Sequence, residues 1–243
     1  MFDRDELLSL APELMLGLVL VWLVIAKVAF NSSFKHNLNI SLFFVFYITA
    51  LVFVLMRYIW LIEPFLLHEM YIIDRATLWC KGYVLLLSGG FLFGALAWEI
   101  TDKKFNPNRA KKDAEYIILF MFGILFCFLL ISSGDFFLTY LNIEGISLFV
   151  SIVVVGYGVR YKVSEAAIKY FCLSAFSSGF ILFGTSLLYK KTQSTSYYEV
   201  QSFFFEEENI YLLQGAWLKT LVVFILIGFL FKLNVAPLHL WST

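Results

Sequence analysis

Residues 116–155 read YIILFMFGILFCFLLISSGDFFLTYLNIEGISLFVSIVVV, two long apolar runs joined by a short polar turn. The stretch holds only two charged residues, Asp135 and Glu144. A helix that crosses a bilayer needs about 20 mainly apolar residues, so the stretch predicts two spans, Tyr116–Ser132 and Phe136–Val155. Lipid admits only helices and closed barrels, and runs without strict apolar–polar alternation predict helices. Asp135 suits the positive end of the second helix dipole.

Similar apolar runs lie on both sides of this stretch. They are Leu14–Phe30, Ile40–Ile62, Leu78–Trp98, Ala166–Tyr189 and a last run from about Leu221 to the end. Hydrophobic residues make up 61% and charged residues 15% of the chain, whereas a soluble domain is about 25% charged. The sequence therefore predicts an all-α fold, a polytopic transmembrane helix bundle of about seven spans.

The polar connectors predict the orientation of the bundle, because lysine and arginine collect on the inner side of a membrane. The longest connectors are Glu99–Glu115 and Lys190–Gly215. One side would carry Lys27, Lys35, Lys103, Lys104, Arg109, Lys111, Lys112, Arg160 and Lys162. The other side would carry Arg4, Arg57, Arg75, Lys81, Lys190 and Lys191, with Lys219 at the boundary. The moderate excess on the first side places the N-terminus outside.

Charge and cysteine usage exclude several other classes. Residues 1–12 include three acidic side chains, unlike a secretory signal or transit peptide, so the first run is expected to be a retained span. Eighteen basic and 18 acidic residues cancel, which argues against a nucleic-acid surface and against a polybasic membrane anchor. Membrane lipids are expected as partners of the apolar spans. Cys80, Cys127 and Cys172 stand singly, which argues against iron–sulfur or zinc sites. No cofactor and no catalytic redox centre are expected in this chain.

Charges inside the apolar runs are the candidate functional residues, because a charge at mid-bilayer costs at least about 2.5–3.5 kcal/mol. Glu144 lies about 12 Å into its span, counted from Phe136 at about 1.5 Å per residue. Lys232 lies about 20 Å along a helix from Lys219. Pro237 would break or kink that helix shortly afterwards. Glu144 and Lys232 are therefore both expected to lie deep in the membrane.

Lys169 is a third candidate near the start of its span. It follows Glu165 by one helical turn, and Ser164 resembles a helix N-cap. Each candidate also has a structural interpretation: Glu144 paired with a neighbouring cation, Lys232 reaching to the interface, and Lys169 in a boundary ion pair with Glu165. Small residues in the same span predict close helix packing; they are Ser174, Ala175, Ser177, Ser178 and Gly179.

Three sets of motifs resemble the NADH dehydrogenase subunit 2 family, the antiporter-like subunits of respiratory complex I. The sequence SEAAIKYF (164–171), followed by LFG (182–184) and LLY (187–189), is fairly specific to this family. The sequences FKL (231–233) and PLHLW (237–241) are similar to the family's broken seventh helix, which Mrp-type cation/proton antiporters share. APE (11–13) resembles the family's start.

The resemblance implies a role for four residues. Glu144, Lys169 and Lys232 would form one proton half-channel, and His239 would relay protons between half-channels. The chain would be a membrane-arm subunit of NADH:ubiquinone oxidoreductase in the mitochondrial inner membrane, with its N-terminus on the intermembrane-space side; a bacterial plasma membrane is the alternative. NADH, FMN, iron–sulfur clusters and ubiquinone would bind elsewhere in the complex, whose other membrane-arm subunits would be the partners.

The family has about twice as many helices, arranged as two inverted repeats. Residues 1–113 are therefore expected to form three N-terminal transmembrane helices, and residues 114–243 an incomplete first antiporter-like repeat with a broken seventh helix. A separate chain is expected to carry the missing second repeat. Two alternatives stay open. One is a subunit of an Mrp-type cation/proton antiporter or membrane hydrogenase, and the other is a structural membrane subunit without proton transport.

Overall fold

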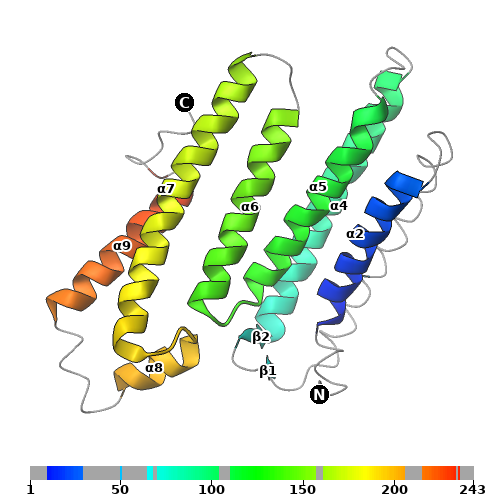
Figure 1. Ribbon diagram of the computed structural model, residues 1–243. Helices are drawn as coiled ribbons and strands as arrows, with labels where there is room; N and C mark the ends of the chain where they lie inside the picture. Colours follow the sequence, from blue (N-terminus) through cyan, green and yellow to red (C-terminus); the bar gives the residue numbers. More distant parts are fainter. Residues whose placement is uncertain are drawn as a thin grey trace. The chain divides into compact units, whose positions relative to one another are not determined.

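A computed structural model describes residues 10–29, 50, 65–67, 70–103, 110–156, 161–205, 215–233 and 235. These residues are mainly helical, as predicted (Figure 1). The helices are α2 (Ala11–Ala29), α4 (Arg75–Lys103), α5 (Ala110–Ile131), α6 (Phe136–Gly156), α7 (Tyr161–Thr192), α8 (Tyr197–Phe205) and α9 (Ala216–Lys232). Two short strands, β1 (Phe65–Leu67) and β2 (Tyr71–Ile73), pair between α2 and α4 in chain order.

The described helices follow the predicted apolar runs closely. Two segments are long and apolar enough to cross a membrane by length and composition, Phe136–Val155 in α6 and Val163–Thr192 in α7. Shorter apolar segments lie in α2 and α5. The predicted span Ile40–Ile62 lies outside the described residues except for Ala50. The number of spans therefore stays a prediction.

Three boundaries differ from the sequence prediction. The connector Lys190–Gly215 contains a helix, α8, that the apolar pattern missed. The predicted N-cap at Ser164 is wrong, because α7 already begins at Tyr161. The last helix begins at Ala216 and ends at Lys232, so it starts earlier than Leu221. Residues 236–243, with Pro237 and the rest of the predicted broken helix, lie outside the described residues.

The chain divides into two compact units, with a boundary between Ser132 and Ser133. Among the described helices, α2, α4 and α5 belong to the first unit and α6 to α9 belong to the second. Compact units need not coincide with the repeats of a family, so the division into residues 1–113 and 114–243 stays a prediction.

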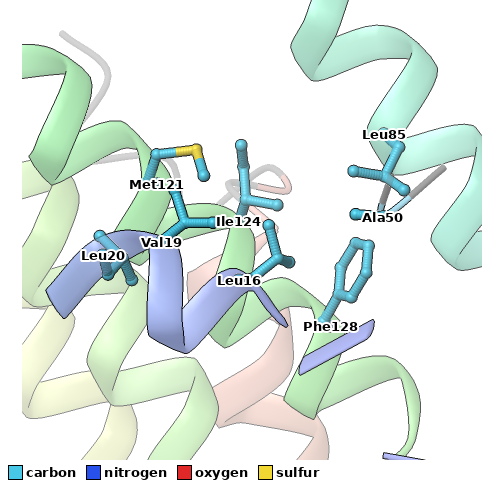
Figure 2. Packing of buried hydrophobic residues seen from close by; sticks show 8 residues of the cluster. All are labelled: Leu16, Val19, Leu20, Ala50, Leu85, Met121, Ile124 and Phe128. Carbon is cyan, nitrogen blue, oxygen red and sulfur yellow. The ribbon is translucent and has the colours of Figure 1, made fainter. Parts of the chain in front are cut away.

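In the first unit, α5 packs against both α2 and α4. Apolar side chains of these three helices meet in one cluster, which Ala50 joins (Figure 2): Leu16, Val19, Leu20, Ala50, Leu85, Met121, Ile124 and Phe128. Gly17 of α2 faces α5, and a Cβ there would make an ordinary van der Waals contact, 3.8 Å from Leu125 Cδ1. The cluster explains why these three helices form one body.

In the second unit, α7 is the central helix and packs against both α6 and α9. Glycines bring α9 close to α7. A Cβ at Gly228 would lie 2.5 Å from Ile181 Cγ1 and 3.0 Å from the backbone oxygen of Ser177. The hydroxyl of Ser177 donates a hydrogen bond to the Gly228 carbonyl at 2.8 Å. This close contact fixes the register between the two helices, and therefore the position of the side chains near the end of α9.

The second unit has polar residues inside and apolar residues outside. Ser147, Ser177 and Asn142 are no more than 4% exposed, whereas Phe176 is 58% and Leu148 is 42% exposed. In water this arrangement would leave large apolar surfaces wetted, but in lipid the outward apolar side chains are well solvated and small residues allow close helix packing. The burial pattern therefore fits a membrane environment.

The start of α6 is tied to the start of α8. Asp135 caps α6, because its Oδ1 accepts a hydrogen bond from the Phe137 amide at 2.6 Å, as the sequence predicted for a helix N-terminus. Its Oδ2 accepts one from the Thr195 hydroxyl at 2.6 Å. The phenol of Tyr197 bonds to Thr139 in the first turn of α6 at 2.5 Å. Burial raises the pKa of Tyr197 above its ordinary value, so the phenol stays a neutral partner in this network.

Candidate functional site

A carboxylate, an ammonium group and a hydroxyl meet inside the second unit. Lys232 Nζ lies 3.6 Å from Glu144 Oε2 and donates a hydrogen bond to Ser174 Oγ at 2.7 Å. Three helices contribute one group each: α6 holds Glu144, α7 holds Ser174 and α9 holds Lys232. Glu144 and Lys232 side chains are 23% and 15% exposed. The structure therefore brings together two of the four predicted site residues.

The carboxylate of Glu144 is only partly engaged. Its Oε2 is buried and makes no hydrogen bond within the described part of the chain. The 3.6 Å separation from Lys232 is an ion-pair distance, longer than a hydrogen bond. A small movement of the lysine head from Ser174 toward Glu144 would close that gap and form a direct bond. In the structure the two groups therefore form an ion pair without a direct hydrogen bond through Oε2.

Lys232 occupies the last turn of α9. Its position suits a cation, because the free carbonyl groups at a helix C-terminus carry partial negative charge. The amide of Leu233 donates to the Phe229 carbonyl at 2.9 Å, and that of Val235 donates to the Leu230 carbonyl at 3.2 Å. These two bonds occupy the carbonyl groups of Phe229 and Leu230, and the remaining partial negative charge of the helix end favours a cation at Lys232.

Lys169 has a different partner. Its ammonium lies 2.7 Å from Glu165 Oε1, one turn earlier on α7, and the two side chains are 67% and 45% exposed. The predicted ion pair between these residues is confirmed. The structure does not add Lys169 to the contact between Glu144 and Lys232, and its implied place in a half-channel stays a prediction. His239 lies outside the described residues.

Two neighbours of the pair, Ser174 and Tyr170, were not predicted to belong to the site. Ser174 was predicted to serve helix packing, but it accepts the hydrogen bond of Lys232. Tyr170 lies one turn before it on α7 and interacts electrostatically with Glu144. Their spacing of four residues places both on one face of α7. That spacing was a usable signal, because it aligns two hydroxyl side chains within an apolar helix.

A family model described as NADH:quinone oxidoreductase/Mrp antiporter, TM, matches residues 133–243, which is the part that contains the described site. Residues 133–243 are thus similar to the transmembrane part of these antiporter-like proteins. The chain is 29% identical to NADH-ubiquinone oxidoreductase chain 2 of Marchantia polymorpha, over 100% of this chain and 49% of that protein. It is 30% identical to NADH-quinone oxidoreductase subunit N of Coxiella burnetii, over 73% of this chain and 35% of that protein. Over most of its length the chain is therefore similar to antiporter-like membrane subunits of NADH:quinone oxidoreductases.

Solved structures share the fold. One chain in respiratory complex I from Thermus thermophilus matches 95% of this chain with a TM-score of 0.68 at 20% identity. A chain of the archaeal membrane-bound sulfane sulfur reductase matches 97% with a TM-score of 0.68 at 17% identity. This chain covers 46% of each of those chains. Most of this chain is matched, but it spans only about half the length of these relatives.

Proposed function

We propose that this chain is a membrane-arm subunit of respiratory complex I and that it contributes one proton half-channel to redox-driven proton translocation. The observation that carries the proposal is the contact between Glu144 and Lys232, two ionisable groups from different helices of an antiporter-like segment. Ionisable groups inside a membrane bundle mark proton relays, because they are too costly to be retained as filler.

The site can store and release one proton by changing the distance between its charges. A carboxylate close to an ammonium group favours the charged form of the lysine, and withdrawal of the carboxylate favours release of the proton. Ser174 offers the ammonium group a neutral resting partner when it is not bonded to Glu144. Lys169 would belong to the same half-channel and His239 would relay protons between half-channels, as the family resemblance implies.

The proposed setting follows that of the relatives. NADH, FMN, iron–sulfur clusters and ubiquinone would bind in other subunits, and the other membrane-arm subunits would be the partners. The membrane would be the mitochondrial inner membrane or a bacterial plasma membrane, with the N-terminus on the outer side. The chain spans about half of its relatives' length, and the segment that corresponds to their other half would supply the rest of the proton path.

Cation exchange is the second candidate function. It is favoured by the description of the matching family, which includes Mrp antiporters. Sodium dependence separates the two functions, since a cation/proton antiporter moves protons in response to a sodium gradient without NADH.

The proposal predicts that Glu144→Gln lowers the number of protons moved per NADH oxidised. The amide keeps the shape of the side chain but cannot hold the charge that Lys232 responds to. We would purify the native complex gently, identify its chains by mass spectrometry, and follow NADH-driven proton uptake in proteoliposomes. Glu199→Gln is the matched control, because Glu199 is exposed on α8. Copurification without flavin or iron–sulfur subunits, or equal proton yields for both variants, would contradict the proposal.

Ser174→Ala is expected to slow proton transfer through this site roughly tenfold, because a hydrogen bond to a charged group is worth about 1.5–3 kcal/mol. Ser174→Thr keeps the hydroxyl and should retain most of the rate. Ser186→Ala serves as the control, since that hydroxyl is exposed on α7 and bonds to its own helix. The measurement is the initial rate of NADH-driven proton uptake. Equal rates for Ser174→Ala and Ser186→Ala would show that Ser174 only fills space.

A further inference from the structure

A second glutamate–lysine pair is buried in the first unit. Glu13 lies in the first turn of α2, and Lys81 lies on α4. The ammonium group of Lys81 donates a hydrogen bond to Glu13 Oε1, and the two side chains are 0% and 6% exposed. The sequence counted Lys81 among the basic residues of the outer side of the membrane, and the structure shows in addition that its side chain is buried inside the unit. The pair is more deeply buried than Glu144 and Lys232.

The surroundings of this pair are apolar. Lys81 Nζ lies 6.0 Å from the centre of the Phe128 ring, and Phe128 belongs to the apolar cluster of the first unit together with Leu16 and Leu85 (Figure 2). Phe128 itself is fully buried. Charges in such surroundings are costly unless they are paired, and apolar residues of similar size would stabilise the same position at least as well. Retention of the pair therefore calls for a role beyond packing.

The carboxylate of Glu13 has unused capacity. Its Oε2 is buried and has no hydrogen-bond partner within the described residues. Glu144 Oε2 in the second unit has the same property. Each unit thus buries one carboxylate and one lysine from different helices, with one carboxylate oxygen left open to accept a proton or a hydrogen bond. The chemistry that marks the site in the second unit is present again in the first.

The other titratable groups around the pair are few. The described side chains of α2, α4 and α5, with the residue before α4, include Asp74, Arg75, Cys80, Tyr83 and Cys127. Arg75, Cys80 and Tyr83 are exposed, and Asp74 caps the start of α4 through a 2.7 Å bond from the Thr77 amide. Glu13 and Lys81 therefore have each other as the nearest strong electrostatic partner among the groups described.

We propose that Glu13 and Lys81 form a second proton-exchanging site, distinct from the one formed by Glu144 and Lys232. In the exchange, an N–H bond of the Lys81 ammonium breaks and an O–H bond forms on Glu13, which leaves a neutral amine and a carboxylic acid. The acid then gives its proton to a water molecule, which becomes hydronium, and the amine takes a proton from a second hydronium ion, which becomes water. One proton has then passed through the site and the charged pair is restored. Because Glu13 lies in the first turn of α2, its route to the aqueous phase is short.

The test is a comparison of three variants in the purified native complex. Glu13→Gln removes the protonatable carboxyl group, Glu13→Leu with Lys81→Met replaces the whole pair by apolar groups, and Lys190→Met with Glu199→Gln neutralises two exposed residues as the control. The readouts are the amount of assembled complex, the protons moved per NADH oxidised, and the carboxyl C=O stretching band in infrared difference spectra recorded during turnover.

The expected result is normal assembly of the apolar double variant, a fall in its proton yield relative to the control, and a turnover-dependent carboxyl band that is absent from Glu13→Gln. An unchanged proton yield in an assembled double variant would overturn the proposal and show that the pair has only a structural role. If the double variant does not assemble, the infrared spectra test the proposal instead. A carboxyl band that is unchanged in the Glu13→Gln variant would then overturn the proposal. Failure of the Glu144→Gln experiment with a Glu13-dependent band present would instead contradict the function proposed for the second unit.

Discussion

Gly228→Val is expected to prevent the packing of α9 on α7 and to reduce the assembled protein severely. A Cβ at this position would lie 2.5 Å from Ile181 Cγ1, 3.0 Å from the Ser177 carbonyl oxygen and 3.1 Å from the Ile181 backbone nitrogen. Overpacking in a core costs about 1–3 kcal/mol, and this position lies at the upper end, because two of the three atoms belong to the backbone. Separation of the helices would also move Lys232 away from Ser174.

Gly179→Val is the matched control for this prediction. Gly179 lies on α7 as well, but no atom lies within 4 Å of a Cβ built there. The amount of complex on native gels and its thermal midpoint would be measured for both variants. Partial rescue of Gly228→Ala by Ile181→Ala is expected, because the second change removes the Cγ1 atom in the clash. Similar midpoints for the two valine variants would show that α9 does not need this contact.

Neutralising one member of the Glu144–Lys232 pair is expected to destabilise the protein more than neutralising both. Glu144→Leu leaves an unpaired ammonium group in the bundle, and Lys232→Met leaves an unpaired carboxylate; each costs up to about 3 kcal/mol. Glu144→Leu with Lys232→Met removes both charges and should recover near-normal assembly. Proton translocation through this site should stay absent in all three variants, because none retains the pair.

This comparison separates a functional pair from a structural one. Assembly is measured on native gels, and proton yield is measured in proteoliposomes with the NADH oxidation rate as the reference. Lys190→Met is the control for loss of a lysine, since Lys190 is exposed in the last turn of α7. A double variant that moves protons at the normal yield would show that the ion pair takes no part in proton transfer and that the proton path lies elsewhere.

The helices were predictable where the sequence contains an apolar run long enough to cross a membrane. The span Phe136–Val155 was expected and α6 covers Phe136–Gly156, because a run of apolar residues has few alternatives to a membrane helix. Helix α8 was missed, because its polar and aromatic residues carry no long apolar run. The start of α7 was misplaced, because a serine can occupy the first turn of a helix as well as the cap position.

The candidate site was predictable only in part. Charges in apolar runs marked Glu144 and Lys232, but their contact depends on the packing of α6 and α9 around α7, which no local pattern encodes. The ion pair of Lys169 with Glu165 was predictable, because it depends only on helical spacing. The burial of Lys81 and its pairing with Glu13 were not predicted, because they depend on the tertiary packing of the first unit.

The polar interior and apolar exterior of the second unit determine which substitutions its sequence can accept. Its outward side chains need only be apolar, so leucine, isoleucine, valine and phenylalanine can replace one another there at little cost. The inward positions, such as Ser177 and Gly228, are limited by size to a small set of residues. A substitution scan would therefore find that exposed apolar positions accept other apolar residues, whereas the buried positions with small side chains accept few substitutions. This explains physically how the fold persists at a TM-score of 0.68 when only 20% of residues are identical.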